Sequence, residues 1–198
     1  MWLQIPMSPA ADSSDSLQPI GPPSTMTTPP TSTLLAVAMS LATSILVGSS
    51  PEPLPAGTKA DLIVVEKAKR SLTAYSNGKL IRSYRVALGS SPVGAKEREG
   101  DNRTPEGEFT IDSRLEKSAF HRALHVSYPG PADIARAKAG GYKPGGAIMI
   151  HGIANGYGWL GSLHTKTDWT RGCIAVTDDE IEELWRIVPN GTRIQIKP

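Results

Sequence analysis

Two side chains carry the chemistry that this sequence could perform near neutral pH. Cys173 is the only cysteine among the 198 residues and lies in the segment DWTRGCIAV. His151 ends an apolar run, Ile148–Ile150, and is followed by the glycine-rich segment 152–161. A strand end that gives way to a loop commonly places a base beside a cleft. We therefore expect a thiol nucleophile with His151 as its base, as an imidazolium–thiolate pair that lowers the thiol pKa from its usual ~8.5.

The neighbours of Cys173 favour catalysis over the alternative of an inert, buried thiol. Gly172 permits close backbone approach, so successive backbone N–H groups at this turn could form an oxyanion hole. Arg171 puts a fixed positive charge beside the thiol, which favours the thiolate. A purely structural histidine remains the alternative for His151.

The other histidines give weaker signals. His164 lies on the loop between His151 and Cys173, where it could line the same cleft or be a surface group. His121 and His125 are four residues apart, but the segment 123–128 has the pattern of a strand, which would place them about 13 Å apart. No third ligand is evident, so we expect no metal site, and the family resemblance described below implies no cofactor.

The charge of the chain is unevenly distributed. All 21 basic residues follow residue 58, together with 16 of the 19 acidic residues, so this part carries a net charge of +5. A small positive excess suits an anionic partner, but it supports one only weakly. The sequence offers no aromatic platform or recognition helix, so we expect no nucleic-acid partner. One cysteine also excludes a disulfide framework.

The first 58 residues differ from the rest in composition. Residues 1–33 are rich in Ser, Thr and Pro, and we expect them to be a disordered leader, with Met26 as an alternative translation start. Residues 34–48 are apolar but short for a membrane span, which needs ~20 residues. They favour a signal-peptide region or short anchor over a buried helix, followed by a linker over 49–58. We therefore expect export to the periplasm or cell envelope, with membrane contact only through 34–48 if uncleaved.

The part from residue 59 alternates with period two and predicts a mainly β domain. Asn77-Gly78 predicts a tight hairpin turn. Two helices are expected, over 131–139 and 177–188, the second with a Thr177–Glu180 capping box and with Trp185 as a core residue rather than a ligand platform. The loop 90–107 is either a solvated connection or a substrate-contacting segment. The expected strands cover residues 61–66, 71–75, 79–88, 107–111, 124–128, 147–150 and 192–197.

These motifs together resemble the L,D-transpeptidase catalytic domain family of bacterial cell-wall enzymes over 59–198. His151-Gly152, a spacer, and Thr170-Arg171-Gly172-Cys173-Ile174 carry the resemblance, with support from GDNRTPEGEF at 100–109 and PGGAIMIHG at 144–152. Arg171 stands where most members have a second histidine, and Ala175 where many have arginine. The sequence looks like the subset with Asp-Trp-Thr-x-Gly-Cys.

The resemblance implies a β-sandwich or barrel-like fold with two short helices and a peptidoglycan stem peptide as substrate. The Cys173 thiolate would attack the carbonyl of the third residue of the stem peptide, release the terminal D-alanine and form a thioester. An amine of a second stem peptide would then resolve the thioester and give a 3→3 cross-link. His151 would act as base and acid, oriented by a carbonyl such as that of Gly152. Backbone N–H groups of Arg171, Gly172 and Cys173 would hold the oxyanion. Arg171, Gly152, Thr170 and His164 would contact substrate, and carbapenems would be inhibitors. A stem-peptide hydrolase and a lapsed wall-binding module are the alternatives.

Overall fold

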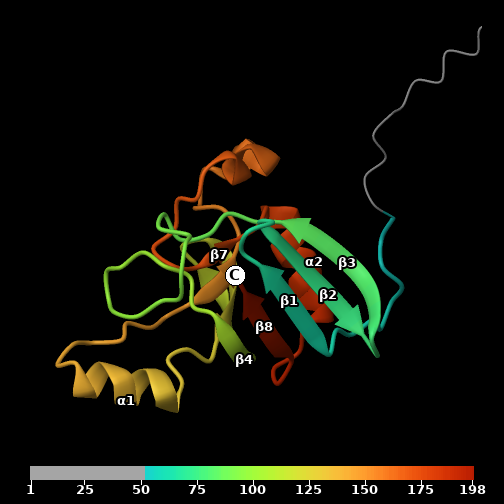
Figure 1. The fold of residues 1–198 in the computed structure, drawn as a ribbon. Coiled ribbons are helices and arrows are strands. Elements are labelled where there is room, and N and C mark those ends of the chain that lie inside the picture. The colour runs from blue at the N-terminus through green and yellow to red at the C-terminus, as the bar shows by residue number, and fades with distance from the viewer. Residues whose placement is uncertain (1–51) are drawn as a thin grey trace, which may run out of the picture. The chain divides into compact units, whose positions relative to one another are not determined.

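Alternating apolar residues build one curled sheet of eight strands in the computed structural model, which describes residues 52–198 (Figure 1). The strand order is β3-β2-β1-β8-β4-β5-β6-β7. Pairing is antiparallel except for β1 with β8 and β6 with β7. The predictions for residues 1–33 and 34–48 and for a start at Met26 lie outside the described residues. The strands are β1 (Leu62–Glu66), β2 (Ser71–Ser76), β3 (Lys79–Arg85), β4 (Gly107–Ser118), β5 (His121–Val126), β6 (Met149–His151), β7 (Ile174–Ala175) and β8 (Arg193–Lys197).

The two ends of this sheet meet. The chain leaving β3 continues through Ala87, which bridges Ala175 of β7, and through Gly89, which bridges Thr170. The first and last strands of the sheet order are therefore joined by the segment 86–89. This closure gives the barrel-like, mainly β fold that the sequence predicted.

Helix α2 (Asp178–Ile187) packs against β5 and β6 and closes the core. Its Thr177–Glu180 capping box is present, as predicted. Ile181 and Leu184 are fully buried, as their spacing requires, whereas Trp185 is partly buried and packs at the edge of the core. Helix α1 (Pro131–Ala139) has the predicted bounds and lies away from α2 (Figure 1).

The structure differs from the sequence prediction at several elements, among them β7, which was not predicted, and β5, which begins at His121 instead of residue 124. A 3₁₀ helix, η1 (Gly158–Lys166), occupies part of the segment that we expected to be loop. The sequence did not indicate it because Gly161, which has a non-helical φ of 47°, interrupts the helical pattern. Strand β4 runs to Ser118, whereas we expected it to end near residue 111. The prediction was too short because the second half of the strand is mostly exposed and polar and lacks alternating apolar residues. The Asn77-Gly78 turn is confirmed, with φ of 50° and 75°.

The start of the described chain touches the domain. Leu54 packs against the core, and the Arg82 guanidinium donates to the carbonyl of Glu52 at 2.6 Å. Within residues 52–198, no helix is long and apolar enough to cross a membrane.

Candidate active site

Cys173 and His151 lie on neighbouring strands. In the parallel pair β6–β7, His151 is opposite Ala175 and Ile150 is opposite Ile174. Cys173 directly precedes β7, two residues before the partner of His151. Residues two apart on a strand point to the same face, so both side chains fall on one face, with Cα atoms roughly 8 Å apart by ideal strand spacing. The sheet register thus brings the two predicted catalytic residues together.

Thr170 holds the turn that presents Cys173. Its hydroxyl donates to the carbonyl of Cys173 at 2.8 Å and accepts the N–H of Gly172 at 3.1 Å. Its backbone pairs with Leu88 and Ser90 across the sheet closure. Side chain–backbone bonds of this kind fix tight turns. The Gly172 N–H already has a partner inside the turn, which favours the N–H groups of Arg171 and Cys173 as oxyanion donors, and our prediction that Gly172 contributes stays a prediction.

The loop 90–106 packs directly on this turn. A Cβ at Gly172, where φ is +128°, would lie 2.7 Å from the carbonyl oxygen of Arg103. A Cβ at Gly89 would lie 2.2 Å from the carbonyl oxygen of Asn102. Only glycine fits such approaches of backbone to backbone. The loop is therefore a wall of the site rather than a free connection.

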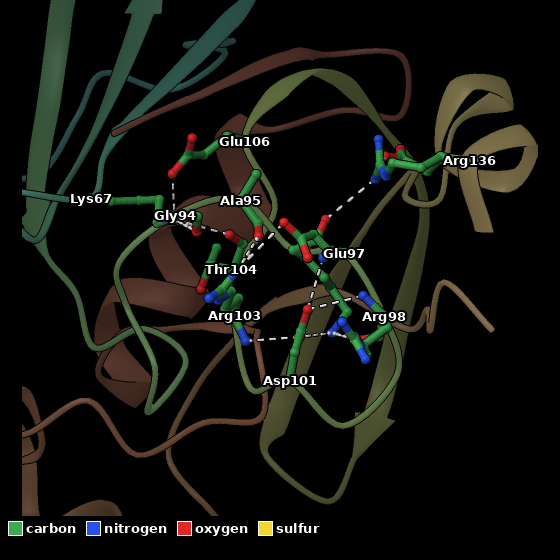
Figure 2. Close-up of polar contacts among 12 residues, drawn as sticks. Lys67, Gly94, Ala95, Glu97, Arg98, Asp101, Arg103, Thr104, Glu106 and Arg136 are labelled. Carbon is green, nitrogen blue, oxygen red and sulfur yellow. Dashed lines mark hydrogen bonds and ion pairs between the residues drawn. The ribbon is translucent and has the colours of Figure 1, made fainter. Parts of the chain in front are cut away.

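Two buried lysines order this loop: Lys67, which directly follows β1 and is shown in Figure 2, and Lys96, which belongs to the loop itself. The Lys67 ammonium is 2% exposed and pairs with Glu106 at 2.7 Å, while also donating to the carbonyls of Gly94 and Thr104. The Lys96 ammonium is 3% exposed and pairs with Asp101 at 2.6 Å. Burial acts to raise the pKa of Asp101, but hydrogen bonds from Lys96 and from the backbone of Arg98, Glu97 and Arg103 lower it to about 2.

The Cys173 thiol is partly buried and donates to the carbonyl of Ala147 at 3.5 Å. Burial raises the pKa of the thiol above its ordinary value, while the backbone N–H of Met149 and the charge of Lys96 act to lower it. We expected the neighbouring Arg171 to be the cation that favours the thiolate. Its side chain is exposed to water, which screens its charge, whereas Lys96 is buried.

His151 is 4% exposed, and its Nδ1 lies 2.7 Å from the carbonyl oxygen of Gly152. This is the orienting bond that we predicted, and it leaves Nε2 to act as the base. The ring packs against Phe120, with centroids 4.5 Å apart, and edge-on against Trp169 at 5.8 Å. Burial lowers the pKa of His151.

Burial therefore lowers the pKa of His151 and raises the pKa of Cys173, and both shifts favour the neutral forms of these side chains. The imidazole is held neutral and the thiol is held protonated. We expected a resting imidazolium–thiolate pair, and these surroundings do not favour one. The arrangement instead suits transfer of the thiol proton to His151 as the sulfur attacks.

His164 is buried, at 6% exposed, and is not a surface group. It borders a pocket of about 310 Å³ together with Trp169, whose ring also contacts His151. Burial lowers the pKa of His164, against the opposing charge of Asp178. The Trp169 ring contacts both histidine rings, so His164 is connected to His151 through Trp169.

The remaining predicted site residues have structural partners. Gly152 is buried, and its N–H donates to the carbonyls of Phe120 and Arg122. His121 and His125 contact separate carboxylates, those of Glu182 and Asp112. No cluster of metal-ligating side chains exists within residues 52–198.

The sequence analysis missed three residues that shape the site: Lys96, Trp169 and Phe120. Lys96 is a single lysine in a polar loop, and nothing in its spacing connects it with a cysteine far along the chain. Trp169 stands in the motif around Cys173, four residues before it, and that position was the available signal. Phe120 lies in the β4–β5 turn and gave none.

The chain is similar in sequence to curated bacterial proteins. YafK of Escherichia coli (strain K12), named as a candidate L,D-transpeptidase, is 27% identical over 132 residues, covering 64% of this chain and 46% of its own length. YkuD of Bacillus licheniformis, with the same designation, is 30% identical over 139 residues, covering 69% of this chain and 65% of its own. This chain thus spans about half the length of YafK.

Solved structures share the fold. The helical cell shape determining protein Pgp2 of Campylobacter jejuni superposes with a TM-score of 0.53 at 21% identity, over 72% of this chain and 49% of that one. Bd1075 of Bdellovibrio bacteriovorus gives 0.50 at 25% identity, over 70% and 48%. Residues 60–196 match the YkuD family, described as the L,D-transpeptidase catalytic domain. The chain belongs to this L,D-transpeptidase catalytic domain family.

Proposed function

We propose that the protein is a peptidoglycan L,D-transpeptidase that acts through Cys173. One observation supports the proposal: in a domain of this family, His151 ends β6 and Cys173 directly precedes its parallel partner β7, at a turn that Thr170 fixes. The family supports a role in the cell wall. The identity of the nucleophile, the thioester and the 3→3 cross-link are our proposals.

The first half-reaction forms a thioester. The thiol sulfur of Cys173 attacks the carbonyl carbon of the third stem residue, while its proton passes to Nε2 of His151. The oxyanion receives hydrogen bonds from the backbone N–H groups of Arg171 and Cys173, and each such donor is typically worth about 3 kcal/mol. The imidazolium then protonates the leaving amine, and the peptide bond to the terminal D-alanine breaks.

The second half-reaction regenerates the enzyme. An amine of a second stem peptide attacks the thioester carbon, His151 takes the amine proton, and the thiolate leaves and is reprotonated. Burial favours the protonated form of the Cys173 thiol, which is oxidised less readily than the thiolate. Such protection suits a protein exported to the cell envelope, which is the location that we propose.

Purified tetrapeptide muropeptides test the proposal. Incubation with the full chain should yield cross-linked dimers that have lost D-alanine, detected by mass spectrometry. Cys173→Ala and His151→Ala should yield none, because the first lacks the nucleophile and the second the base. Tripeptide products without dimers would instead make the protein a stem-peptide hydrolase.

A second measurement is independent of the acceptor. A carbapenem should add its mass to the protein at Cys173, since opening of the lactam needs only the nucleophile and base. Failure of both assays, with the fold intact, would leave the domain as a wall-binding module.

A further inference from the structure

A pocket beside His151 has no assigned role. It is about 310 Å³ in volume and lies where the chain leaves β6 and passes through η1. Gly161 breaks η1 into two turns, so that Leu160 and Leu163 both border the pocket. Ile153 and Tyr157 complete an apolar wall, opposite the rings of His164 and Trp169.

Three nitrogen atoms in these two rings are buried without a hydrogen-bond partner among the described residues. They are Nδ1 and Nε2 of His164 and Nε1 of Trp169. His164 as a whole is only 6% exposed. Buried polar atoms are normally paired, so three orphans in adjoining rings indicate a partner that comes from outside the chain. The rings lie edge to face with centroids 6.4 Å apart. Both rings line the pocket, so a ligand there would bond these nitrogens once a ring turns about its terminal torsion.

The chemistry of these atoms restricts that partner. Burial lowers the pKa of His164, so its imidazole is neutral and offers one donor and one acceptor. The indole of Trp169 adds a second donor. A carboxylate has acceptors but no donor. It would also be desolvated, because none of the described residues that line the pocket is Lys, Arg, Asp or Glu.

We propose that this pocket binds an uncharged secondary amide that carries a small apolar group, as part of the substrate that the Cys173–His151 site acts on. The amide C=O accepts from the Trp169 indole N–H, its N–H donates to the acceptor nitrogen of His164, and the apolar group packs against Leu160 and Ile153. The link to a wall substrate rests on the proposed function. Peptidoglycan chemistry offers such a group in two places, an alanyl peptide unit and the N-acetyl group of its sugars.

Binding can be measured apart from catalysis. The full-length Cys173→Ala variant, ¹⁵N-labelled, is titrated with trialanine amide and, separately, with N,N′-diacetylchitobiose. We expect saturable movement of the Trp169 indole N–H resonance, assigned by its loss in Trp169→Phe, with one of the two probes. The probe that binds identifies the source of the amide. Chitobiose without acetyl groups and sodium acetate are the chemical controls, and neither should saturate.

Variants of the pocket complete the test. His164→Phe keeps the volume of the ring but removes its donor and acceptor, and should raise the Kd at least tenfold, whereas His164→Gln should bind more tightly than His164→Phe. Trp159→Phe is the matched control, because its indole is on η1 but 77% exposed. If His164→Phe does not fold, Leu160→Trp fills the pocket and should abolish binding.

The proposal is overturned if neither probe moves the Trp169 resonance, if acetate binds more tightly than the amides, or if binding survives both His164→Phe and Leu160→Trp. Each of these results can occur while wild-type protein still cross-links muropeptides. Conversely, amide binding by the Cys173→Ala variant does not depend on any turnover. The two proposals therefore fail separately.

Discussion

The hydroxyl of Thr170 binds the backbone of Cys173, three residues later, and closes the turn that carries the nucleophile. The bond to the Cys173 carbonyl is 2.8 Å long, and the same oxygen accepts the Gly172 N–H at 3.1 Å. Thr170 is buried, so water cannot replace either bond. The position of the sulfur thus depends on one hydroxyl group.

Removing this hydroxyl should therefore impair catalysis more than folding. In Thr170→Val the shape is kept but the Gly172 N–H is left unpaired, which should cost about 1–3 kcal/mol of unfolding free energy. Displacement of the sulfur should lower kcat about 10- to 100-fold. Thr170→Ser keeps the hydroxyl and should retain most activity. Urea unfolding and the muropeptide assay measure the two effects, and equal kcat for the Val and Ser variants would contradict this role.

Lys96 should promote ionisation of Cys173 from across the site. In Lys96→Met the thiol pKa should rise, and alkylation by iodoacetamide at pH 7 should slow by roughly 3- to 10-fold. Lys67→Met is the matched control, because Lys67 forms a buried pair with Glu106 in the same loop but is not among the charges that act on Cys173. Equal slowing in both variants would mean that loop order, not charge, is responsible.

The Lys96–Asp101 pair should make stability depend on acidity. The pKa of Asp101 is about 2 in the fold against 3.8 ordinarily, so its ionised form stabilises the protein above pH ~4, and this contribution is lost as pH falls through about 2. Asp101→Asn should lose up to about 2 kcal/mol of unfolding free energy at pH 7 and little at pH 2. Glu97→Gln, at an exposed position in the same loop, should change little at either pH. A loss for Asp101→Asn that does not vary with pH would refute the linkage.

The buried His151 should set the acid limb of the activity profile. Because burial lowers its pKa below the ordinary 6.5, kcat/KM should stay high until the pH falls below that value. A resting ion pair would behave differently: the thiol would titrate several units below its usual range, and His151→Ala would raise its pKa sharply. We expect His151→Ala to change the alkylation pKa of Cys173 little. A large change would restore the ion-pair interpretation.

Gly172 should tolerate no side chain. In Gly172→Ala the new Cβ would lie 2.7 Å from the carbonyl oxygen of Arg103, and the residue would keep an unfavourable φ of +128°. Gly156→Ala is a useful comparison, since φ there is +87° but no atom lies within 4 Å of the new Cβ. Both variants carry backbone strain, so the additional loss of Tm and activity in Gly172→Ala reports the contact with the loop. Equal losses would mean that this contact carries no energy.

Local patterns predicted those parts of the fold that local physics decides. The Asn77-Gly78 turn, the bounds of α1 and the capping box of α2 each follow from a few neighbouring residues. The strand that ends at His151 was predicted in the same way. The sheet order and the closure through Ala87 depend on residues far apart in the chain, and no short pattern specifies them.

The residues of the candidate site likewise fall into those that local sequence predicts and those that depend on long-range contacts. Cys173 and His151 are recognisable from residue type and immediate neighbours. We assigned the cation near the thiol to Arg171 and overlooked Lys96, because adjacency in sequence is visible while burial is not. His164 and Trp169 could be assigned to one pocket only after η1 had folded them together.

The closure of the sheet also affects the tendency of the protein to self-associate. An unpaired strand edge is a template for another chain, and proteins usually cover such edges. Here the segment 86–89 pairs with Ala175 of the short strand β7 and with Thr170 before it, within a few residues of the nucleophile. A motion that opened the Cys173 turn would therefore also expose an unpaired strand edge. Rigidity at this point protects solubility as well as catalytic geometry, and damage to the turn should lead toward aggregation.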